Sequence, residues 1–333
     1  MVEREDMGAA IAGLPEQLLE GAAIGAAAGA RLRRPSAIVF AGMGGSAIAG
    51  ELLRGLIADT CPVPITRVRS FGVPKWAGPG TLVVCVSYSG DTAETLACAR
   101  QAQSQGAAIL AVTAGGMLAR HAEEFEQPLA RVPAVITGMP RAALGLLFGA
   151  TASAFAEAGL APPGLAEQAA AGAAAADAEE ARELGLRLSD TVPLVYGFGP
   201  LAIVAYRWKT QLNENAKMPA FSHAFPEFAH NEIVGWAGSG AAPFAAVLLR
   251  EADQPPRQRA LMDSASDLIS GDAALIEDVS ARGSSAAEQA FSLVSHGDWV
   301  SYHAALARGV DPIPIDRIEA LKSRLDAWRA DPA

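Results

Sequence analysis

Residues 37–47 read AIVFAGMGGSA, a short apolar run that breaks into a glycine-rich turn. A helical pattern follows over residues 47–57, so this stretch predicts a strand, a tight turn and a helix. Residues 81–86, TLVVCV, repeat the arrangement, since they run into SYSGDT at residues 87–92 and then into a helix over residues 93–103. Strands that alternate with helices in this way are typical of a parallel sheet covered on both faces, which predicts the α/β fold class.

The same arrangement restarts near residue 190. Residues 192–196 predict a strand, GFGP at residues 197–200 a glycine-rich turn, and residues 201–213 a helix. We therefore expect two doubly wound parallel-sheet domains in tandem. Further strands are expected at residues 63–68, 107–113, 245–249 and 291–294.

The length of the chain agrees with two domains. At about 150 residues per domain, 333 residues have room for two units, each large enough to bury a core. The join is expected within residues 160–183, where the step Pro162-Pro163-Gly164 signals a turn and an alanine-rich helix follows. We predict an N-terminal domain at residues 1–160 and a C-terminal domain at residues 161–333.

Composition and charge exclude several classes of protein. Hydrophobic residues make up 51% of the chain and charged residues 19%, which excludes a disordered or fibrous protein. The 26 basic and 36 acidic residues give a net charge of −10, which argues against nucleic acid or an anionic membrane as the main partner. A small anionic substrate stays compatible, because one pocket can be positive on an acidic protein.

No segment predicts export or a membrane span. The N-terminus lacks a basic region followed by an apolar core, and the longest uncharged stretches, such as residues 191–206, are interrupted by Gly and Pro. The three cysteines, Cys61, Cys85 and Cys98, form no CxxC pair, so reduced and mostly buried thiols are expected. These features predict a cytoplasmic location.

The turn GMGGSA at residues 42–47 fits the pattern GxGxxG/A between a strand and a helix. Backbone N–H groups at a helix start attract anions, and the missing Cβ atoms let a ligand approach. A dinucleotide site has the same pattern, but it also needs an acidic residue about 20 positions on to hold the ribose. Here that region reads ITRVRS, in which Arg67 or Arg69 would have to serve the 2′-phosphate of NADP. A turn without any ligand is the plain alternative.

The segment SYSGDT at residues 87–92 brings three hydroxyl groups to the start of a helix. Such hydroxyls, together with helix N–H groups, can surround a phosphate without a fixed charge. An ordinary N-cap, in which Thr92 or Asp91 caps the helix, is the alternative, but a cap explains only one of these residues. In a doubly wound sheet both loops lie at the carboxyl ends of strands, where ligands bind. The two loops together predict a phosphate site.

The densest set of reactive side chains lies in residues 211–236. A metal site is weakly indicated there, because His223, Glu227 and His230 lack the HExxH spacing and two prolines break any common helix. Solvated charges in a loop are the plain alternative. The interpretation we favour is a carboxylate base with a histidine partner. The segment holds Glu214, Lys217, His223, Glu227, His230 and Glu232.

Six motifs stand in order along the chain: GMGGSA at residues 42–47, SYSGDT at 87–92, PRAALG at 140–145, NENAK at 213–217, HNE at 230–232 and DPxPxxxIxxLK at 311–322. In this order they resemble the bifunctional phosphoglucose/phosphomannose isomerases, a family built from two sugar isomerase (SIS) domains. The resemblance covers nearly the whole chain. It implies two SIS-type doubly wound domains in tandem and an aldose–ketose isomerase that needs neither a metal nor a redox cofactor.

The resemblance also implies roles for individual residues. Glu214 would be the catalytic base, Arg141 would lie against the developing enediolate, and His230 and Lys322 would open the sugar ring. The family's histidine enters the site from the neighbouring subunit, which implies a homodimer. The residues that would bind the substrate phosphate are Gly45, Ser46, Ser87, Ser89 and Thr92.

Two rival functions and one departure from the family pattern stay open at this point. A non-catalytic SIS module would bind sugar phosphates without a base, and an NADP-dependent oxidoreductase would use the GxGxxA turn. The family often carries a hydroxyl residue near the start of the C-terminal motif, which is linked to acceptance of the mannose epimer. This chain has Ile313 and Ile315 there, so the glucose reaction is the more secure expectation.

Overall fold

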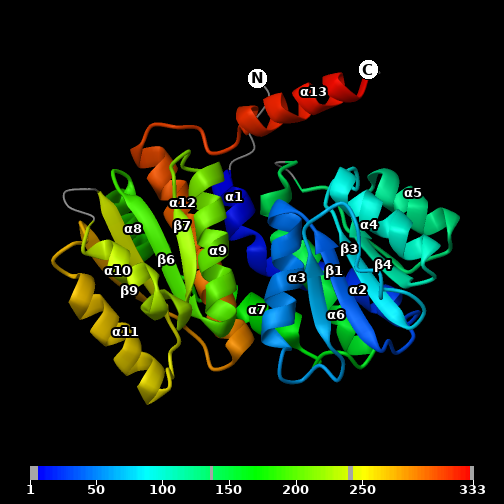
Figure 1. The fold of residues 1–333 in the computed structure, drawn as a ribbon, viewed down its shortest axis with the longest axis horizontal. Helices are drawn as coiled ribbons and strands as arrows, with labels where there is room; N and C mark the ends of the chain where they lie inside the picture. Colours follow the sequence, from blue (N-terminus) through cyan, green and yellow to red (C-terminus); the bar gives the residue numbers. More distant parts are fainter. Residues whose placement is uncertain (1–6, 136–137, 239–242, 331–333) are drawn as a thin grey trace.

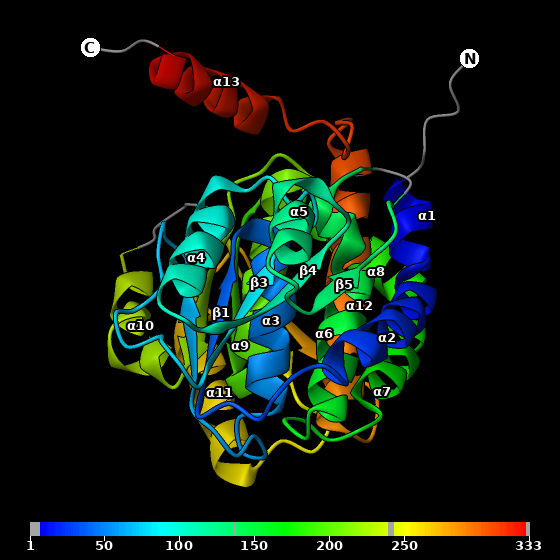
Figure 2. The same ribbon diagram turned by 90° about the vertical axis from the view of Figure 1, so that its right-hand side faces the viewer.

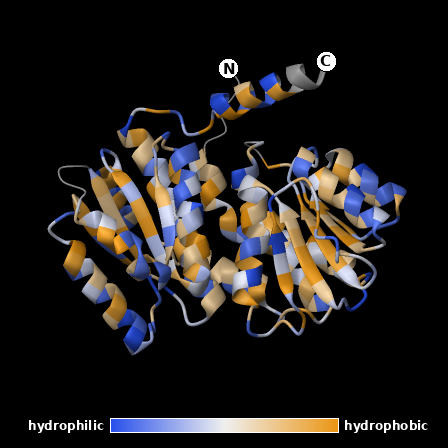
Figure 3. Ribbon diagram, in the orientation of Figure 1, coloured by the Kyte–Doolittle hydropathy of each residue, from blue (hydrophilic) through white to orange (hydrophobic). Residues whose placement is uncertain are grey.

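The computed structural model describes residues 7–135, 138–238 and 243–330 of the chain. In these ranges two parallel β-sheets lie side by side, and helices cover both faces of each sheet (Figure 1). The strands of the N-terminal sheet are strongly hydrophobic, as Figure 3 shows, because a parallel sheet between two helical layers buries both of its faces. The expected fold class, two doubly wound parallel sheets in one chain, is confirmed.

The N-terminal sheet has the strand order β2-β1-β3-β4-β5, and all of its pairs are parallel. The helices α4 and α5 cover one face, and α3 and α6 cover the other, with α2 packed on the outside of α6 (Figure 2). The strands are β1 (Ala37–Gly42), β2 (Ile65–Val68), β3 (Thr81–Val86), β4 (Ala108–Thr113) and β5 (Leu129–Arg131). The helices are α1 (Met7–Ala12), α2 (Leu14–Gly29), α3 (Gly44–Leu56), α4 (Ala93–Ser104), α5 (Gly116–Glu124), the 3₁₀ helix η1 (Pro140–Ala143) and α6 (Leu144–Glu157).

The C-terminal sheet has the order β7-β6-β8-β9 and is also parallel. The helices α8, α9 and α12 cover its inner face, and α10 and α11 lie on its outer face. The strands are β6 (Val192–Phe198), β7 (Phe221–Phe225), β8 (Phe244–Arg250) and β9 (Leu275–Ser280). The helices are α7 (Leu165–Ala174), α8 (Ala178–Leu188), α9 (Gly199–Glu214), η2 (Glu227–His230), α10 (Glu232–Trp236), α11 (Pro256–Ile269), α12 (Ala286–Ala307) and α13 (Asp316–Ala330).

The two sheets meet through helices. The helix α3 packs against α9, and α7 contacts both α2 of the N-terminal half and α12 of the C-terminal half. The side chains of both halves therefore belong to one continuous hydrophobic core. The division of the chain at residue 160 stays a prediction, since α7 follows that point and packs against both halves.

The predicted strand at residues 291–294 is wrong, because these residues lie inside the helix α12. The Ser285 hydroxyl accepts a hydrogen bond from the Glu288 backbone N–H in a capping box, which starts the helix at Ala286. A short apolar run does not distinguish a strand from a buried helix, and α12 is buried around most of its circumference. The fourth strand of this sheet is β9 instead, whose Glu277 and Asp278 interrupt the apolar pattern.

The helix α13 stands away from the rest of the molecule (Figures 1 and 2). Every residue of 316–325 is exposed, including the apolar Ile318, Leu321 and Leu325. A single helix of this length is marginal in water without packing. Within the described residues, no helix is long and apolar enough to cross a lipid bilayer.

Candidate active site

The two loops of the predicted phosphate site lie next to each other. The strands β1 and β3 are parallel neighbours, with Gly42 opposite Val86, so the turns that follow them leave the sheet at the same edge. Ser46, in the first turn of α3, accepts a hydrogen bond at its Oγ from the Tyr88 backbone N–H at 3.1 Å. Ser46 is buried, and its hydrogen bond to Tyr88 links the first loop to the second.

The hydroxyl groups of the second loop bond within the loop. The Oγ of Ser87 lies 2.9 Å from the Oγ1 of Thr92 and accepts from the Gly90 N–H at 3.2 Å. The exposed Ser89 accepts from the Asp91 N–H at 3.3 Å. Thr92 occupies the N-cap position of α4 but makes no capping bond, since its hydroxyl faces Ser87. Ser87 and Thr92 therefore direct their hydroxyls toward each other instead of capping the helix, while Ser89 is exposed to solvent.

Arg141 is packed directly against the first loop. A Cβ atom on Gly45 would lie 3.0 Å from the Arg141 Cα and 3.2 Å from its backbone N. This contact is tighter than most real Cβ contacts, so glycine at this position lets η1 lie against the start of α3. The turn and the arginine, 96 residues apart in the chain, form one wall of the site.

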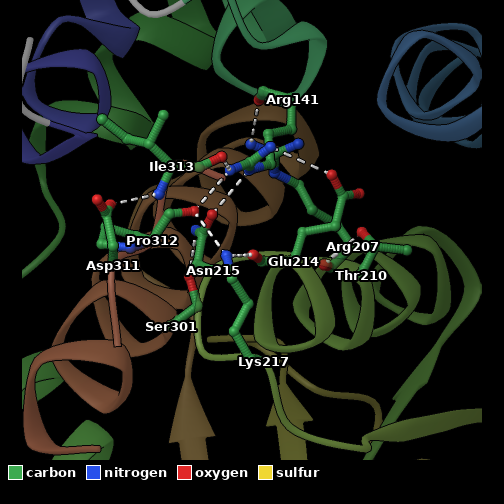
Figure 4. A network of polar contacts seen from close by, with 10 residues as sticks. All are labelled: Arg141, Arg207, Thr210, Glu214, Asn215, Lys217, Ser301, Asp311, Pro312 and Ile313. Atoms are coloured by element: carbon green, nitrogen blue, oxygen red, sulfur yellow. Dashed lines mark hydrogen bonds and ion pairs between the residues drawn. The ribbon is translucent and has the colours of Figure 1, made fainter. Parts of the chain in front are cut away.

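The guanidinium of Arg141 has four partners, and Figure 4 shows the network. Its Nε donates to the Asn215 Oδ1 at 2.8 Å, its Nη1 lies 3.3 Å from the Glu214 Oε2, and its Nη2 donates to the carbonyls of Pro312 and Ile313 at 2.7 and 3.0 Å. The side chain is only 2% exposed. Burial lowers the pKa of Arg141, and the negative charge of Glu214 opposes that effect.

Glu214 ends the helix α9, and its side chain is 26% exposed. Arg141 holds one carboxylate oxygen, while the exposed fraction leaves the group accessible from solvent. Lys217, whose φ of 54° lies in the left-handed region, donates from Nζ to the carbonyls of Glu214 and Pro312. Burial, followed by the nearby Arg141, lowers the pKa of Lys217. A carboxylate within reach of a buried cation can take a proton from a bound substrate.

His230 and Lys322 lie elsewhere in the chain. Within the described ranges, neither side chain makes a hydrogen bond or ion pair with Glu214 or Arg141. His230 is exposed at the end of η2, and Lys322 is exposed on α13. One copy of the chain thus brings together the phosphate loops, Arg141 and Glu214, but not the two groups assigned to ring opening.

The residues considered for a metal do not converge. The Nδ1 of His223 lies 2.8 Å from the Oε2 of Glu232, whose other oxygen accepts from the Tyr196 hydroxyl at 2.7 Å. Glu227 accepts instead from the Asn231 side chain at 2.7 Å. The residues that the structure describes contain no group of three or more His, Cys, Asp or Glu that could hold a metal ion.

The arginines considered for a 2′-phosphate have another partner. Arg67 Nη1 lies 2.9 Å from the Glu51 carboxylate, and Arg69 pairs with the same carboxylate. The Arg69 guanidinium also stacks over the Tyr206 ring, 4.6 Å from its centroid. Glu51 is buried, so moving either arginine to a ligand would take an ion-pair partner away from the buried Glu51 carboxylate. This geometry does not favour the dinucleotide interpretation.

The three cysteines are free thiols, as expected. Cys85 is fully buried, and burial raises the pKa of its thiol. Burial also raises the pKa of Cys98 to about 11. Thiols held in the protonated form are poor nucleophiles, so these two cysteines serve packing.

Sequence reasoning missed three polar residues that surround Arg141. Arg207 and Asp298 form a buried ion pair, and Ser301 accepts a hydrogen bond from Asn215. A charged residue within an otherwise apolar helix was the available signal, since Arg207 follows LAIVAY and Asp298 follows FSLVSHG. Charges in such surroundings are almost never fully buried unless paired.

The fold and the site together define the class of protein. The structure is similar to the C-terminal domain of glucosamine-fructose-6-phosphate aminotransferase from Francisella tularensis, with a TM-score of 0.70 at 15% identity over 92% of this chain and 98% of that one. Residues 177–325 match the family described as bacterial phospho-glucose isomerase C-terminal SIS domain. The chain therefore has the SIS fold. The loops that follow β1 and β3 are neighbours in this fold.

The sequence narrows the class further. A bifunctional phosphoglucose/phosphomannose isomerase from Caldicellulosiruptor bescii is 34% identical over 329 residues, which covers 94% of this chain and 96% of the relative. One from Thermoplasma acidophilum is 33% identical over 87% of this chain and 90% of the relative. The chain belongs to the bifunctional phosphoglucose/phosphomannose isomerase family, and it is an isomerase.

Proposed function

We propose that the protein interconverts glucose 6-phosphate and fructose 6-phosphate through an enediolate. The observation that carries this proposal is the partly exposed Glu214 carboxylate held 3.3 Å from the buried Arg141 guanidinium. Arg141 packs against the glycine-rich loop, which Ser46 links to the hydroxyl-rich loop. The reaction moves one proton between C2 and C1, which requires one carboxylate base and positive charge near the developing oxyanion. Relatives that share the family name support the substrate class.

The phosphate binds, in this proposal, at the loops that follow β1 and β3. Ser87, Ser89 and Thr92 offer hydroxyl groups, and Gly45 and Ser46 lie at the start of α3, where backbone N–H groups favour an anion. Neutral donors suit a phosphate that must both bind and leave. The sugar then extends from these loops toward Glu214.

The proton transfer uses Glu214 and Arg141. Glu214 takes the proton from C2 of the open-chain aldose, the electron pair moves to the carbonyl oxygen, and Arg141 stabilises the enediolate. The hydroxyl proton on O2 moves to O1, the electron pair on O2 forms the new carbonyl at C2, and the protonated Glu214 returns its proton to C1, which gives the ketose and restores the carboxylate. All atoms of the substrate are kept, and the steps use side chains alone.

Ring opening is the role proposed for His230 and Lys322, and it requires a second subunit. His230 is exposed in one copy and would enter the partner's site across a homodimer interface. Lys322 lies on the exposed helix α13 and would come to a site when that helix packs. We expect this assembly to act in the cytoplasm.

Mannose 6-phosphate is the second proposed substrate. Ile313 and Ile315 stand where the family often has a hydroxyl residue, and the Ile313 carbonyl is bound by Arg141. An apolar side chain there offers no hydrogen bond to distinguish or hold the C2 hydroxyl. We therefore expect a lower kcat/KM for mannose 6-phosphate than for glucose 6-phosphate in coupled assays. The same assays with and without EDTA test whether the activity depends on a metal ion.

The test of the proposal is the variant Glu214→Gln, which keeps the shape of the side chain but removes the base. General-base catalysis contributes about 10²–10⁴-fold, so kcat should fall by that factor while fructose 6-phosphate still binds. Exchange of the C2 proton with solvent should disappear in parallel. The matched control is Glu227→Gln, an exposed glutamate bonded to Asn231, which should keep full activity. A Glu214→Gln protein with a tenth of normal turnover would show that another residue is the base.

The same assay separates the proposal from its alternative, a regulatory SIS module. A regulatory module would bind fructose 6-phosphate and leave it unchanged. Wild-type protein that binds the sugar phosphate without converting it would therefore establish the alternative.

A further inference from the structure

A buried ion pair lies directly behind Arg141. Arg207 on α9 donates from Nε to the Asp298 Oδ1 at 2.9 Å and from Nη2 to the Oδ2 at 2.6 Å. Arg207 is 2% exposed and Asp298 is 3% exposed. Burying two charges costs about as much as their attraction returns, so such a pair is weak grounds for stability by itself. The pair therefore calls for another explanation.

Close packing of two helices brings this pair together. A Cβ atom on Gly297 would lie 2.1 Å from the Nε1 of Trp208, so α12 and α9 approach each other closely there. The Trp208 Nε1 donates to the Leu293 carbonyl at 2.7 Å, which fixes the register of the two helices. Arg207 and Asp298 are the immediate neighbours of Trp208 and Gly297. Their relative position is thus rigid.

Hydrogen bonds from α9 and α12 reach Arg141 along two routes. Arg207 Nη2 donates to the Arg141 backbone carbonyl at 3.2 Å. A second route uses the backbone of α12 and not the Asp298 side chain: the Asp298 backbone carbonyl accepts from the Ser301 hydroxyl at 2.7 Å, Ser301 accepts from Asn215 Nδ2 at 2.9 Å, and Asn215 Oδ1 accepts from Arg141 Nε at 2.8 Å. The hydrogen bonds hold the backbone of Arg141 and its guanidinium at the same time.

We propose that Arg207 and Asp298 are positioning residues for catalysis: Asp298 orients the Arg207 guanidinium, whose hydrogen bond to the Arg141 carbonyl holds η1 so that the Arg141 guanidinium lies against Glu214 and the reacting oxygens. Both side chains are buried and contact Arg141 or its partners, so they act through Arg141 and not on the substrate. This inference rests on the proposed function. A misplacement of about 1 Å in a group that stabilises a transition state costs up to about 100-fold in rate.

A purely structural role is the alternative, and a paired apolar replacement separates the two. Removing one partner leaves an uncompensated buried charge, so Arg207→Met or Asp298→Leu alone should be strongly destabilised. The double variant Arg207→Met/Asp298→Leu removes both charges and should regain wild-type unfolding in urea. It still lacks the donor to the Arg141 carbonyl. We expect its kcat to stay at least tenfold below wild type, with KM for fructose 6-phosphate changed less than threefold.

Arg207→Lys is a second variant that keeps the charge. One ammonium group cannot reproduce the two-pronged contact with Asp298 and the bond to Arg141 together, so kcat should fall several-fold while the fold is kept. The matched control is Arg250→Met/Asp278→Asn, which removes the ion pairs that Arg250, at the end of β8, makes with Asp278 and Asp263, and it should leave kcat unchanged.

The outcomes separate this inference from the proposed function. If wild-type protein does not convert fructose 6-phosphate, the proposed function is wrong. If wild-type protein is active, and the stable double variant or Arg207→Lys keeps more than half of its kcat, the positioning role is overturned. Activity that falls only in proportion to the folded fraction would also overturn it.

Discussion

The two sheets have the same order of their first four strands but different chemistry at their carboxyl ends. After β1 and β3 the N-terminal half presents Ser46 and the hydroxyl-rich residues 87–92. At the equivalent places the C-terminal half has the buried Leu201 and the acidic residues 251–255, EADQP. Acidic side chains repel a phosphate. The fold supplies two equivalent sheet edges, and in the proposed function the loop residues decide which edge binds the phosphate.

The helices that follow β1 and β6 show a second contrast. The helix α3 contributes its first turn, with Gly45 and Ser46, whereas α9 contributes its last residue, Glu214. The two helices pack together, and Arg141 lies against both of these ends. In the proposed function, one half of the molecule thus provides the start of a helix for the phosphate, and the other provides the carboxylate base.

The first prediction removes the hydroxyl groups that distinguish the loop at residues 87–92 from the equivalent C-terminal loop at residues 251–255. The variant Ser87→Ala/Ser89→Ala/Thr92→Ala should lose at least about 10³-fold in kcat/KM, since each of the three hydrogen bonds to a charged group contributes about 1.5–3 kcal/mol. Ser89→Ala alone should raise KM more than it lowers kcat. Asp253→Ala in the equivalent C-terminal loop is the control and should change neither value. An unchanged KM in the triple variant would place the phosphate elsewhere.

A second prediction concerns whether the Glu214 and the His230 of one active site come from two different subunits. If His230 acts in the partner's site, a dimer of one Glu214→Gln and one His230→Ala subunit has one intact site. Statistical mixing of the two inactive proteins should then restore about a quarter of wild-type activity. No recovery, although native mass spectrometry shows that subunits exchange, would mean that both residues act within one subunit.

The two glycine turns allow a sharper comparison. Gly45→Ala should lower kcat about tenfold, because its Cβ would press on Arg141 at 3.0 Å and displace it. Gly199→Ala meets nothing within 4 Å, but φ is +47°, so it should cost about 1–2 kcal/mol of stability and leave kcat unchanged. Steady-state kinetics and urea unfolding of both variants test this. An equal loss of kcat in the two variants would contradict a specific role of Gly45 in placing Arg141.

The last prediction concerns a buried histidine in the C-terminal half and the stability of the fold, not the rate of the reaction. Burial, followed by the charge of Arg282, lowers the pKa of His296 to about 4 from an ordinary 6.5. Between these two values the unfolded chain binds the extra proton, so stability falls as the pH falls from 6.5 toward 4. We expect this one group to remove about 2–3 kcal/mol of unfolding free energy by pH 4.5.

The matched variant is His296→Phe, which keeps a ring beside Trp208 and removes the titration. Its unfolding free energy in urea should fall less than that of wild type between pH 7 and pH 4.5. The same acid dependence in both proteins would show that other groups cause it.

Local patterns in the sequence were enough to predict the fold class, the glycine-rich loop at residues 42–47, the hydroxyl-rich loop at residues 87–92, and Glu214 near the end of a helix. These features depend on local signals: apolar runs of strand length, glycines at turns, and polar residues where a strand gives way to a helix. The same local signals misplaced the strand at residues 291–294, because α12 is buried on nearly every side and shows no helical stripe.

Only the tertiary structure decided how distant residues combine. Arg141 meets Glu214 across 73 positions, and Arg207 meets Asp298 across 91, through the packing of helices whose register no local pattern shows. The resemblance of motifs named Arg141 and Glu214. The apolar surroundings of Arg207 and Asp298 marked each as an unusual charge, but no local pattern paired them or indicated the Pro312 and Ile313 carbonyls that Arg141 holds. Such contacts depend on side-chain packing between elements far apart in the chain, where a few tenths of an ångström decide whether a hydrogen bond forms.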